Sequence, residues 1–150
     1  MKVILDFKNK ESLDIINCLA DLKYKKNIEV DILAFDIENK NTIERSYFAL
    51  YYAKNYGVEY EFSKRVLEAY HLEDKNISKL DVLASCYEDI GYDRNDMIDS
   101  LMDGDYNDMY NHIQRSYQEH YHIKDACTII KEDKTKIEGY SNILNYLKDK

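Results

Sequence analysis

The feature that most constrains the fold is the placement of strand-like runs at the two ends of the chain only. Residues 2–7 contain a continuous apolar run, which is typical of a short buried strand. Residues 28–37 alternate between apolar and acidic side chains, and this alternation predicts a second strand. Apolar residues at helical spacing over 15–22 lie between them. A strand-helix-strand unit of this size predicts a parallel pair joined by a right-handed crossover.

The other end of the chain has a complementary pattern. Residues 126–130 and 136–138 predict two strands joined by a charged turn, and residues 143–147 predict a last helix. Residues 41–118, between the two ends, carry apolar side chains at helical spacing. Because the strands of both ends need partners in one sheet, we expect an α/β fold and a single domain over residues 1–150.

Charge and hydropathy exclude several functional classes. The net charge is -8 and the pI is near 5.0, so no basic stripe is present to neutralise phosphates, and we expect no nucleic-acid partner. An anionic membrane surface is disfavoured for the same reason. No apolar run has the length of a transmembrane helix, and the N-terminal apolar run is too short for a signal peptide. The expected location is therefore cytoplasmic.

The cysteines and histidines predict neither a disulfide framework nor a metal site. Cys18, Cys86 and Cys127 are widely separated and odd in number. Cys18 and Cys86 have leucine and isoleucine neighbours at helical spacing, so we expect both in the core. The histidines of residues 112–122 have no carboxylate at a spacing typical of metal ligands, so we expect them to be exposed or hydrogen-bonded.

Four short segments, taken in their order and spacing, carry a resemblance to a known family. They are Asn41-Thr42, Val66-Leu67-Glu68-Ala69-Tyr70, Ile90-Gly91-Tyr92-Asp93 and Ile137-Glu138-Gly139-Tyr140. Together they resemble the DsbA family, and specifically its FrnE-like branch. The resemblance implies a thioredoxin-like fold with an inserted helical subdomain. Residues 1–38 and 119–150 would form the thioredoxin-like core, and residues 41–118 the helical insertion.

The family's catalytic dithiol is missing from this chain. In the family an Asp-Phe pair ends the first strand and a Cys-x-x-C begins the first helix. Asp6-Phe7 is present here, but the four active positions read Asn9-Lys10-Glu11-Ser12. An amide at position 9 cannot attack a disulfide, and the Ser12 hydroxyl cannot resolve a mixed disulfide. Related glutathione-dependent enzymes place serine at the first position, where this chain has Asn9. The resemblance therefore implies no catalytic residue, no metal and no cofactor.

A second departure lies in the loop before the third expected strand. The family has a cis-proline there, and Cys127 occupies its position. Because a non-proline cis bond costs about 2.5–4 kcal/mol, we expect a trans peptide. The family's loop faces the dithiol, which implies a pocket lined by Asn9, Ser12 and Cys127. The simpler interpretation is that Cys127 is a buried packing residue without chemistry. We favour this interpretation because free cysteines in proteins are usually buried packing residues.

Two functional hypotheses follow. In the first, the protein is a non-catalytic binding or adaptor module that holds a peptide or protein in the former active-site groove. In the second, Cys127 supports a weak thiol- or glutathione-dependent activity. The missing Cys-x-x-C favours the first hypothesis, although fold alone does not decide whether the protein is an enzyme.

Overall fold

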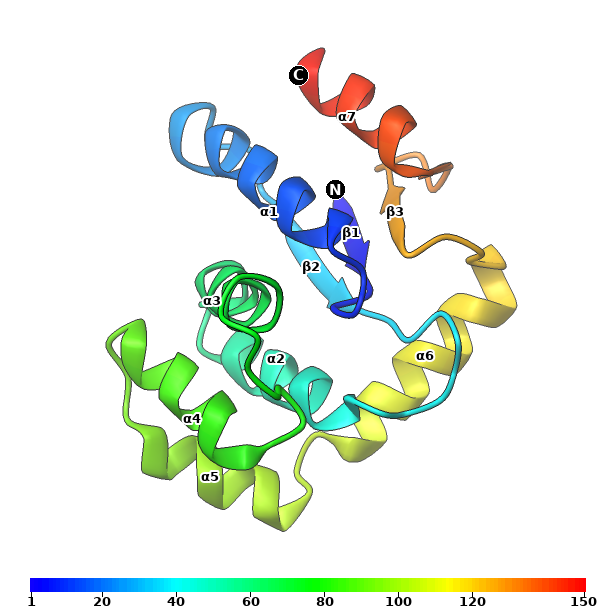
Figure 1. The fold of residues 1–150 in the computed structure, drawn as a ribbon. Helices are drawn as coiled ribbons and strands as arrows, with labels where there is room; N and C mark the ends of the chain where they lie inside the picture. The colour runs from blue at the N-terminus through cyan, green and yellow to red at the C-terminus, as the bar shows by residue number, and fades with distance from the viewer.

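Four strands, two from each end of the chain, form one mixed sheet in the computed structural model, which describes residues 1–150 (Figure 1). They are β1 (Lys2–Leu5), β2 (Asp31–Ala34), β3 (Cys127–Ile130) and β4 (Lys136–Glu138). The order across the sheet is β2-β1-β3-β4, with β1 parallel to β2 and antiparallel to β3, and β3 antiparallel to β4. The α/β class predicted from the sequence is confirmed.

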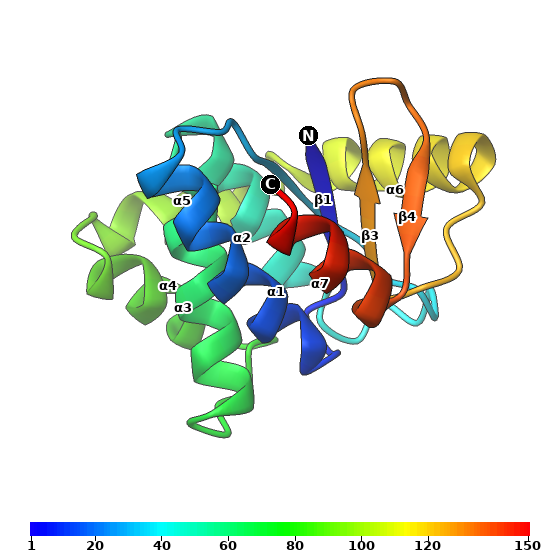
Figure 2. The ribbon, with the colours of Figure 1, turned by 90° about the horizontal axis from the view of Figure 1, so that it is seen from above.

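The two central strands are buried on both faces because helices cover the sheet from both sides. Figure 2 shows α1 (Glu11–Ala20) and α7 (Tyr140–Lys148) in front of the strands and α6 (Asn107–Tyr121) behind them. Every residue of β3 is buried, as is β1 from Val3 onward. A strand covered on both faces needs apolar residues at successive positions, which explains the continuous apolar runs at both ends of the sequence.

A run of helices connects β2 to β3, as the sequence predicted. Its members are α2 (Glu44–Asn55), α3 (Glu59–His71), α4 (Leu80–Asp89), α5 (Arg94–Asp103) and then α6. Helix α2 is buried throughout residues 46–53 and joins the helical run to the sheet. The Tyr51 hydroxyl donates to the main-chain oxygen of Ala34 and accepts from its nitrogen, each at 3.2 Å. The boundary expected at residues 118 and 119 falls inside α6.

The ends of several helices differ from the sequence pattern. A π-helical segment, η1 (Asp21–Lys25), directly continues α1. Residues 41–44 resemble a capping box, but α2 begins at Glu44 without a side-chain cap. Asn41 instead has a left-handed backbone with φ of 53°, and its N–H donates to Asp36 Oδ2 at 2.8 Å. Helix α5 has a side-chain cap, because Asp93 accepts from the N–H of Asn95 at 2.8 Å.

The lengths and hydropathy of the helices bear on membrane insertion. None of the helices combines the length and apolar character that crossing a bilayer requires. The cytoplasmic location stays a prediction. The absence of a nucleic-acid partner, inferred from the net charge of -8, also stays a prediction.

Candidate functional site

Asn9 stands where the resemblance places the first catalytic thiol. It lies in the turn between β1 and α1 and is half-buried at the surface. Its Oδ1 accepts from the N–H of Glu11 at 2.9 Å, so the side chain satisfies one of the free donors at the start of the helix. This interaction gives the first turn of α1 a side-chain acceptor from the residue before Lys10. The amide is therefore already engaged by the fold.

Ser12 and Cys127 are brought together, but both are fully buried. The Ser12 hydroxyl donates to the main-chain oxygen of Asp6 at 2.7 Å and lies 3.6 Å from Cys127 Sγ. All peptide bonds are trans, including the one before Cys127. Burial raises the pKa of the Cys127 thiol to about 12, so the thiol stays protonated at neutral pH. Because thiol chemistry needs the thiolate and access to it, this arrangement opposes reaction at Cys127.

The other two cysteines differ in exposure. Cys86 is buried in α4, as predicted, and burial raises its pKa to about 11. Cys18 was expected in the core, and this expectation is wrong because its side chain is exposed. The buried face of α1 is formed by Ile15, Ile16 and Leu19, and Cys18 falls to the side of that face. All three cysteines are free.

A buried carboxylate follows each of the two parallel strands. Asp6 comes directly after β1, and both of its oxygens are engaged. Oδ1 accepts from the N–H of Lys8 at 2.9 Å and from the Tyr47 hydroxyl at 3.0 Å. Oδ2 accepts from the N–H of Ile37 at 3.1 Å, which joins the turn after β1 to the loop after β2. Asp6 therefore acts as a link between the two loops at this edge of the sheet.

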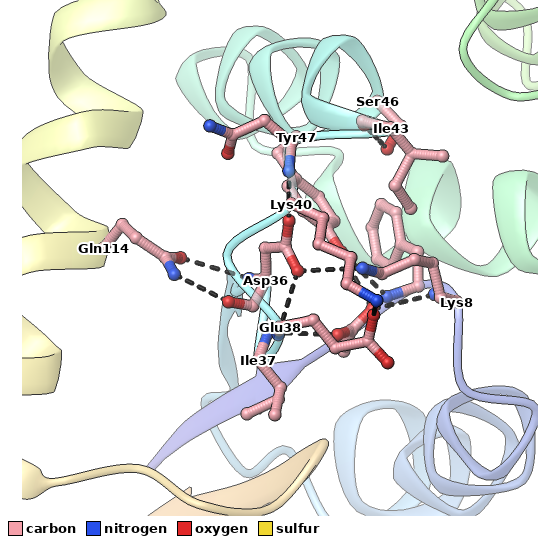
Figure 3. A network of polar contacts seen from close by, with 12 residues as sticks. Lys8, Asp36, Ile37, Glu38, Lys40, Ile43, Ser46, Tyr47 and Gln114 are labelled. Atoms are coloured by element: carbon pink, nitrogen blue, oxygen red, sulfur yellow. Dashed lines mark hydrogen bonds and ion pairs between the residues drawn. The ribbon is translucent and has the colours of Figure 1, made fainter.

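Asp36, in the loop after β2, likewise joins separate segments of the chain through hydrogen bonds (Figure 3). Its Oδ1 accepts from Lys8 Nζ at 2.8 Å and from the N–H of Glu38 at 3.1 Å. The side-chain amide of Gln114, on α6, donates to the main-chain oxygen of Asp36 at 2.7 Å and accepts from its nitrogen at 3.1 Å. In the alternating run of residues 28–37 the acids, Asp36 among them, are expected on the solvated face of the strand. That interpretation is wrong, because β2 ends at Ala34 and the chain turns inward to bury Asp36.

The fold shifts the pKa values of the two carboxyl groups in opposite directions. Burial raises the pKa of Asp6, and hydrogen bonds from the main chain of Lys8 and Ile37 only partly offset this effect. Burial also acts to raise the pKa of Asp36, but the Lys8 ammonium and main-chain donors outweigh it and lower the pKa. Since every oxygen of the pair has a donor within the protein, we interpret this network as the structure that fixes both loops.

An open cleft lies beside Asp36, between the loop after β2 and helix α6. Its volume is about 440 Å³. Most of its lining is polar, with amide side chains most frequent and one cation and one further acid beside them: Phe35, Asp36, Ile37, Asn39, Asn111, Gln114, Arg115, Gln118 and Glu119. Gln114 already uses its amide to bind a main-chain group of the protein, as described above. The cleft is open to solvent at this edge of the sheet.

The sequence interpretation missed this cleft. The signal available was the recurrence of Asn111, Gln114 and Gln118 at helical spacing on one face of α6. A polar helix face is ordinarily solvated, so the pattern alone does not distinguish a plain solvated face from the wall of a cleft. The opposite wall, at residues 35–39, comes from a distant part of the chain.

The histidines do not form a site. His112, His120 and His122 are all exposed. No group of three or more histidine, cysteine, aspartate or glutamate side chains is arranged to hold a metal ion. The geometry therefore directs attention to the amide-lined cleft and to the start of α1.

Comparison with known proteins adds no assignment to this geometry. No protein-family model matches the chain, and no curated protein matches it. The resemblance to the DsbA family consequently rests on the four short segments of the sequence. Because a fold alone does not determine function, the function of this chain is inferred from the geometry of the site.

Proposed function

We propose that this protein is a peptide-binding module of the DsbA/FrnE-like, thioredoxin-fold lineage that has no dithiol redox activity. In this proposal residues 1–38 and 119–150 form the thioredoxin-like core and residues 41–118 the helical insertion. The mixed sheet built from both ends of the chain, with helices inserted between β2 and β3, is consistent with this lineage. The four resembling segments support it from the sequence.

The closed contact between Ser12 and Cys127 supports the absence of redox chemistry. A dithiol enzyme needs a reactive thiolate at the start of the helix and a second thiol that resolves the mixed disulfide. Here the first position is Asn9, the second is Ser12, and the nearby thiol of Cys127 is fully buried. The raised pKa of Cys127 also disfavours the alternative of a weak thiol- or glutathione-dependent activity.

The observation that carries the binding proposal is the pairing between the Gln114 amide and the main chain of Asp36 in the cleft wall. An extended peptide offers the same N–H and C=O groups along its length, and a primary amide can satisfy both. Asn39, Asn111 and Gln118 line the same cleft, and their side-chain amides make no hydrogen bond within the protein. They are therefore free to pair with the main chain of a bound peptide.

The binding proposal is tested with a fluorescently labelled, reduced and fully alkylated polypeptide, which exposes main chain and offers no disulfide. Fluorescence anisotropy should show binding by the wild-type protein. Replacing both Asn111 and Gln118 by alanine should weaken binding about thirtyfold, since each of the two lost hydrogen bonds contributes on the order of 1 kcal/mol. The matched control is Asn55→Ala with Asn145→Ala, which removes two exposed helical amides elsewhere.

Three results would contradict the proposal. The wild-type protein could fail to bind the alkylated polypeptide, or the cleft variant could bind as tightly as the control variant at an unchanged melting temperature. Insulin reduction above a no-protein control that disappears in Cys127→Ala would overturn the redox part.

An Asn9→Trp variant shows whether the bound peptide extends over the start of α1, because the bulky ring would then weaken binding.

A further inference from the structure

Five tyrosines from separate parts of the helical run pack together at the surface and form what we call the tyrosine patch. Its members are Tyr52, Tyr56, Tyr87, Tyr92 and Tyr106. Tyr52 is the buried centre, with ring centroids 5.1 Å from Tyr56, 5.3 Å from Tyr87 and 5.9 Å from Tyr106. Tyr92 stacks on Tyr87 at 5.1 Å. The outer rings are thus held in place by neighbouring rings.

Two rings of the tyrosine patch are exposed to solvent. Tyr56 is 56% exposed and Tyr92 is 41% exposed, whereas Tyr52 and Tyr87 are buried. A tyrosine ring fixed by its neighbours loses little conformational freedom when a partner covers it. The faces of Tyr56 and Tyr92 are therefore suited to stacking with a group from another molecule.

The chain segment that contributes Tyr92 and Tyr106 to the tyrosine patch is strongly acidic. Residues 88–108, which contain Tyr92 and Tyr106 and all of α5, include eight acidic residues and one basic residue. This segment thus accounts for almost the whole net charge of -8. Glu88 pairs with Arg94, and Asp89 pairs with Arg65. The other six acids are exposed and form no ion pair within the protein: Asp93, Asp96, Asp99, Asp103, Asp105 and Asp108.

We propose that the tyrosine patch and the acidic residues around it form a docking surface for a basic, arginine-containing segment of another protein. Cations bind over tyrosine faces, and arginine does so best because its planar guanidinium stacks on the ring. The six exposed, unpaired acids of residues 88–108 complement the positive charge of such a segment and increase its rate of encounter. No residue of the amide-lined cleft belongs to this surface, so it is a second site, independent of the proposed peptide cleft.

The test compares labelled oligo-arginine and oligo-lysine peptides of equal length by fluorescence anisotropy. The two peptides carry the same charge, so a difference between them reports stacking rather than net electrostatics. The wild-type protein should bind oligo-arginine more tightly. Replacing Tyr56 and Tyr92 by alanine should weaken oligo-arginine binding about tenfold, given the usual strength of exposed cation–π contacts, and should remove the preference. Replacing both by phenylalanine should preserve it.

Two controls separate the surface from general attraction to an acidic protein. Tyr24→Ala removes a tyrosine that is 60% exposed elsewhere and should leave binding unchanged. Asp96→Asn with Asp99→Asn should weaken both peptides, whereas Glu29→Gln with Glu132→Gln, which removes the same charge from other exposed positions, should have a smaller effect.

The proposal would be overturned by equal binding of the two peptides to the wild-type protein. Unchanged oligo-arginine binding by the Tyr56 and Tyr92 alanine variant would also overturn it. Sedimentation analysis tests whether the surface instead binds a second copy of this chain. If the wild-type protein is a dimer and the alanine variant a monomer, the surface binds a second copy of this chain and the proposal of a basic partner is wrong.

Discussion

The stability of the sheet edge that carries the cleft depends on Asp36, and an Asp36→Asn substitution tests this dependence. The carboxylate is buried and accepts from Lys8 Nζ, from the N–H of Glu38 and from the N–H of Asn41. An asparagine keeps one acceptor oxygen and can retain the first two contacts. Its NH₂ group must then face the N–H of Asn41, which leaves two donors opposed.

The magnitude follows from these contacts. A buried donor left without an acceptor costs about 1–3 kcal/mol. The ion pair to Lys8 adds on the order of 0.5 kcal/mol, since the lysine is partly exposed and recovers water. We therefore expect the free energy of unfolding to fall by about 2 kcal/mol, which corresponds to a decrease of about 4–8 °C in melting temperature for a chain of this size.

The assay is urea unfolding at neutral pH followed by circular dichroism, with Glu38→Gln as the matched control. Glu38 lies in the same loop, but its side chain is exposed and pairs only with Lys40, so the control should change stability by less than about 0.5 kcal/mol. An Asp36→Asn protein as stable as this control would refute the assignment of Asp36 as the residue that fixes the loop.

Acidification provides an independent check on the same carboxylate. The pKa of Asp36 is lowered in the folded protein, so its contribution is present above the pKa of the unfolded chain and is lost as the pH falls through the folded pKa. The pKa of Asp6 is raised, so its contribution has the opposite sign: it is present below the unfolded pKa and is lost as the pH rises through the folded pKa. The stability difference between wild-type and Asp36→Asn proteins should therefore shrink at acid pH, and a constant difference would contradict this account.

The remaining predictions concern the start of α1 and the cysteines. A thiol-modifying reagent should label Cys18 rapidly in the native protein and reach Cys86 and Cys127 only after unfolding, as followed by mass spectrometry. Asn9→Ala should lower stability by about 1 kcal/mol in urea unfolding because the helix loses a capping acceptor, whereas Asn9→Asp should be close to neutral. In a Ser12→Cys protein the new thiol should lie against Cys127, and oxidative refolding of the reduced, unfolded chain should give an intramolecular disulfide on non-reducing analysis. Absence of that disulfide would contradict the observed contact.

The sheet could be predicted from the sequence because its central strands are buried on both faces. Continuous apolar runs at residues 2–7 and 126–130 have few alternative interpretations once helices flank them. The limits of β2 could not be predicted as well, because the alternation of residues 28–37 continues past Ala34, where the strand ends. The same continuation led to the wrong placement of Asp36 on a solvated face.

The candidate site was predictable only in part. The cap by Asn9 follows from local chemistry, and the placement of Ser12 near Cys127 was implied by the family resemblance. Their complete burial depends on how the turn after β1 packs, which no local pattern records. The amide-lined cleft has walls at residues 35–39 and 111–119, and only tertiary folding brings these two segments together.

The pairing of β1 with β3 also sets the order in which the chain can fold during synthesis. Val3 lies opposite Ile129, so one edge of the first strand has no partner until the last strands have left the ribosome. Until then the nascent chain exposes an apolar strand edge, which favours pairing with other chains. Within the helical run of residues 44–121 each of α2, α3 and α4 packs on the helix that follows it, so these helices can form first. A chain interrupted before Cys127 would therefore contain ordered helices beside an incomplete sheet and would be prone to aggregation.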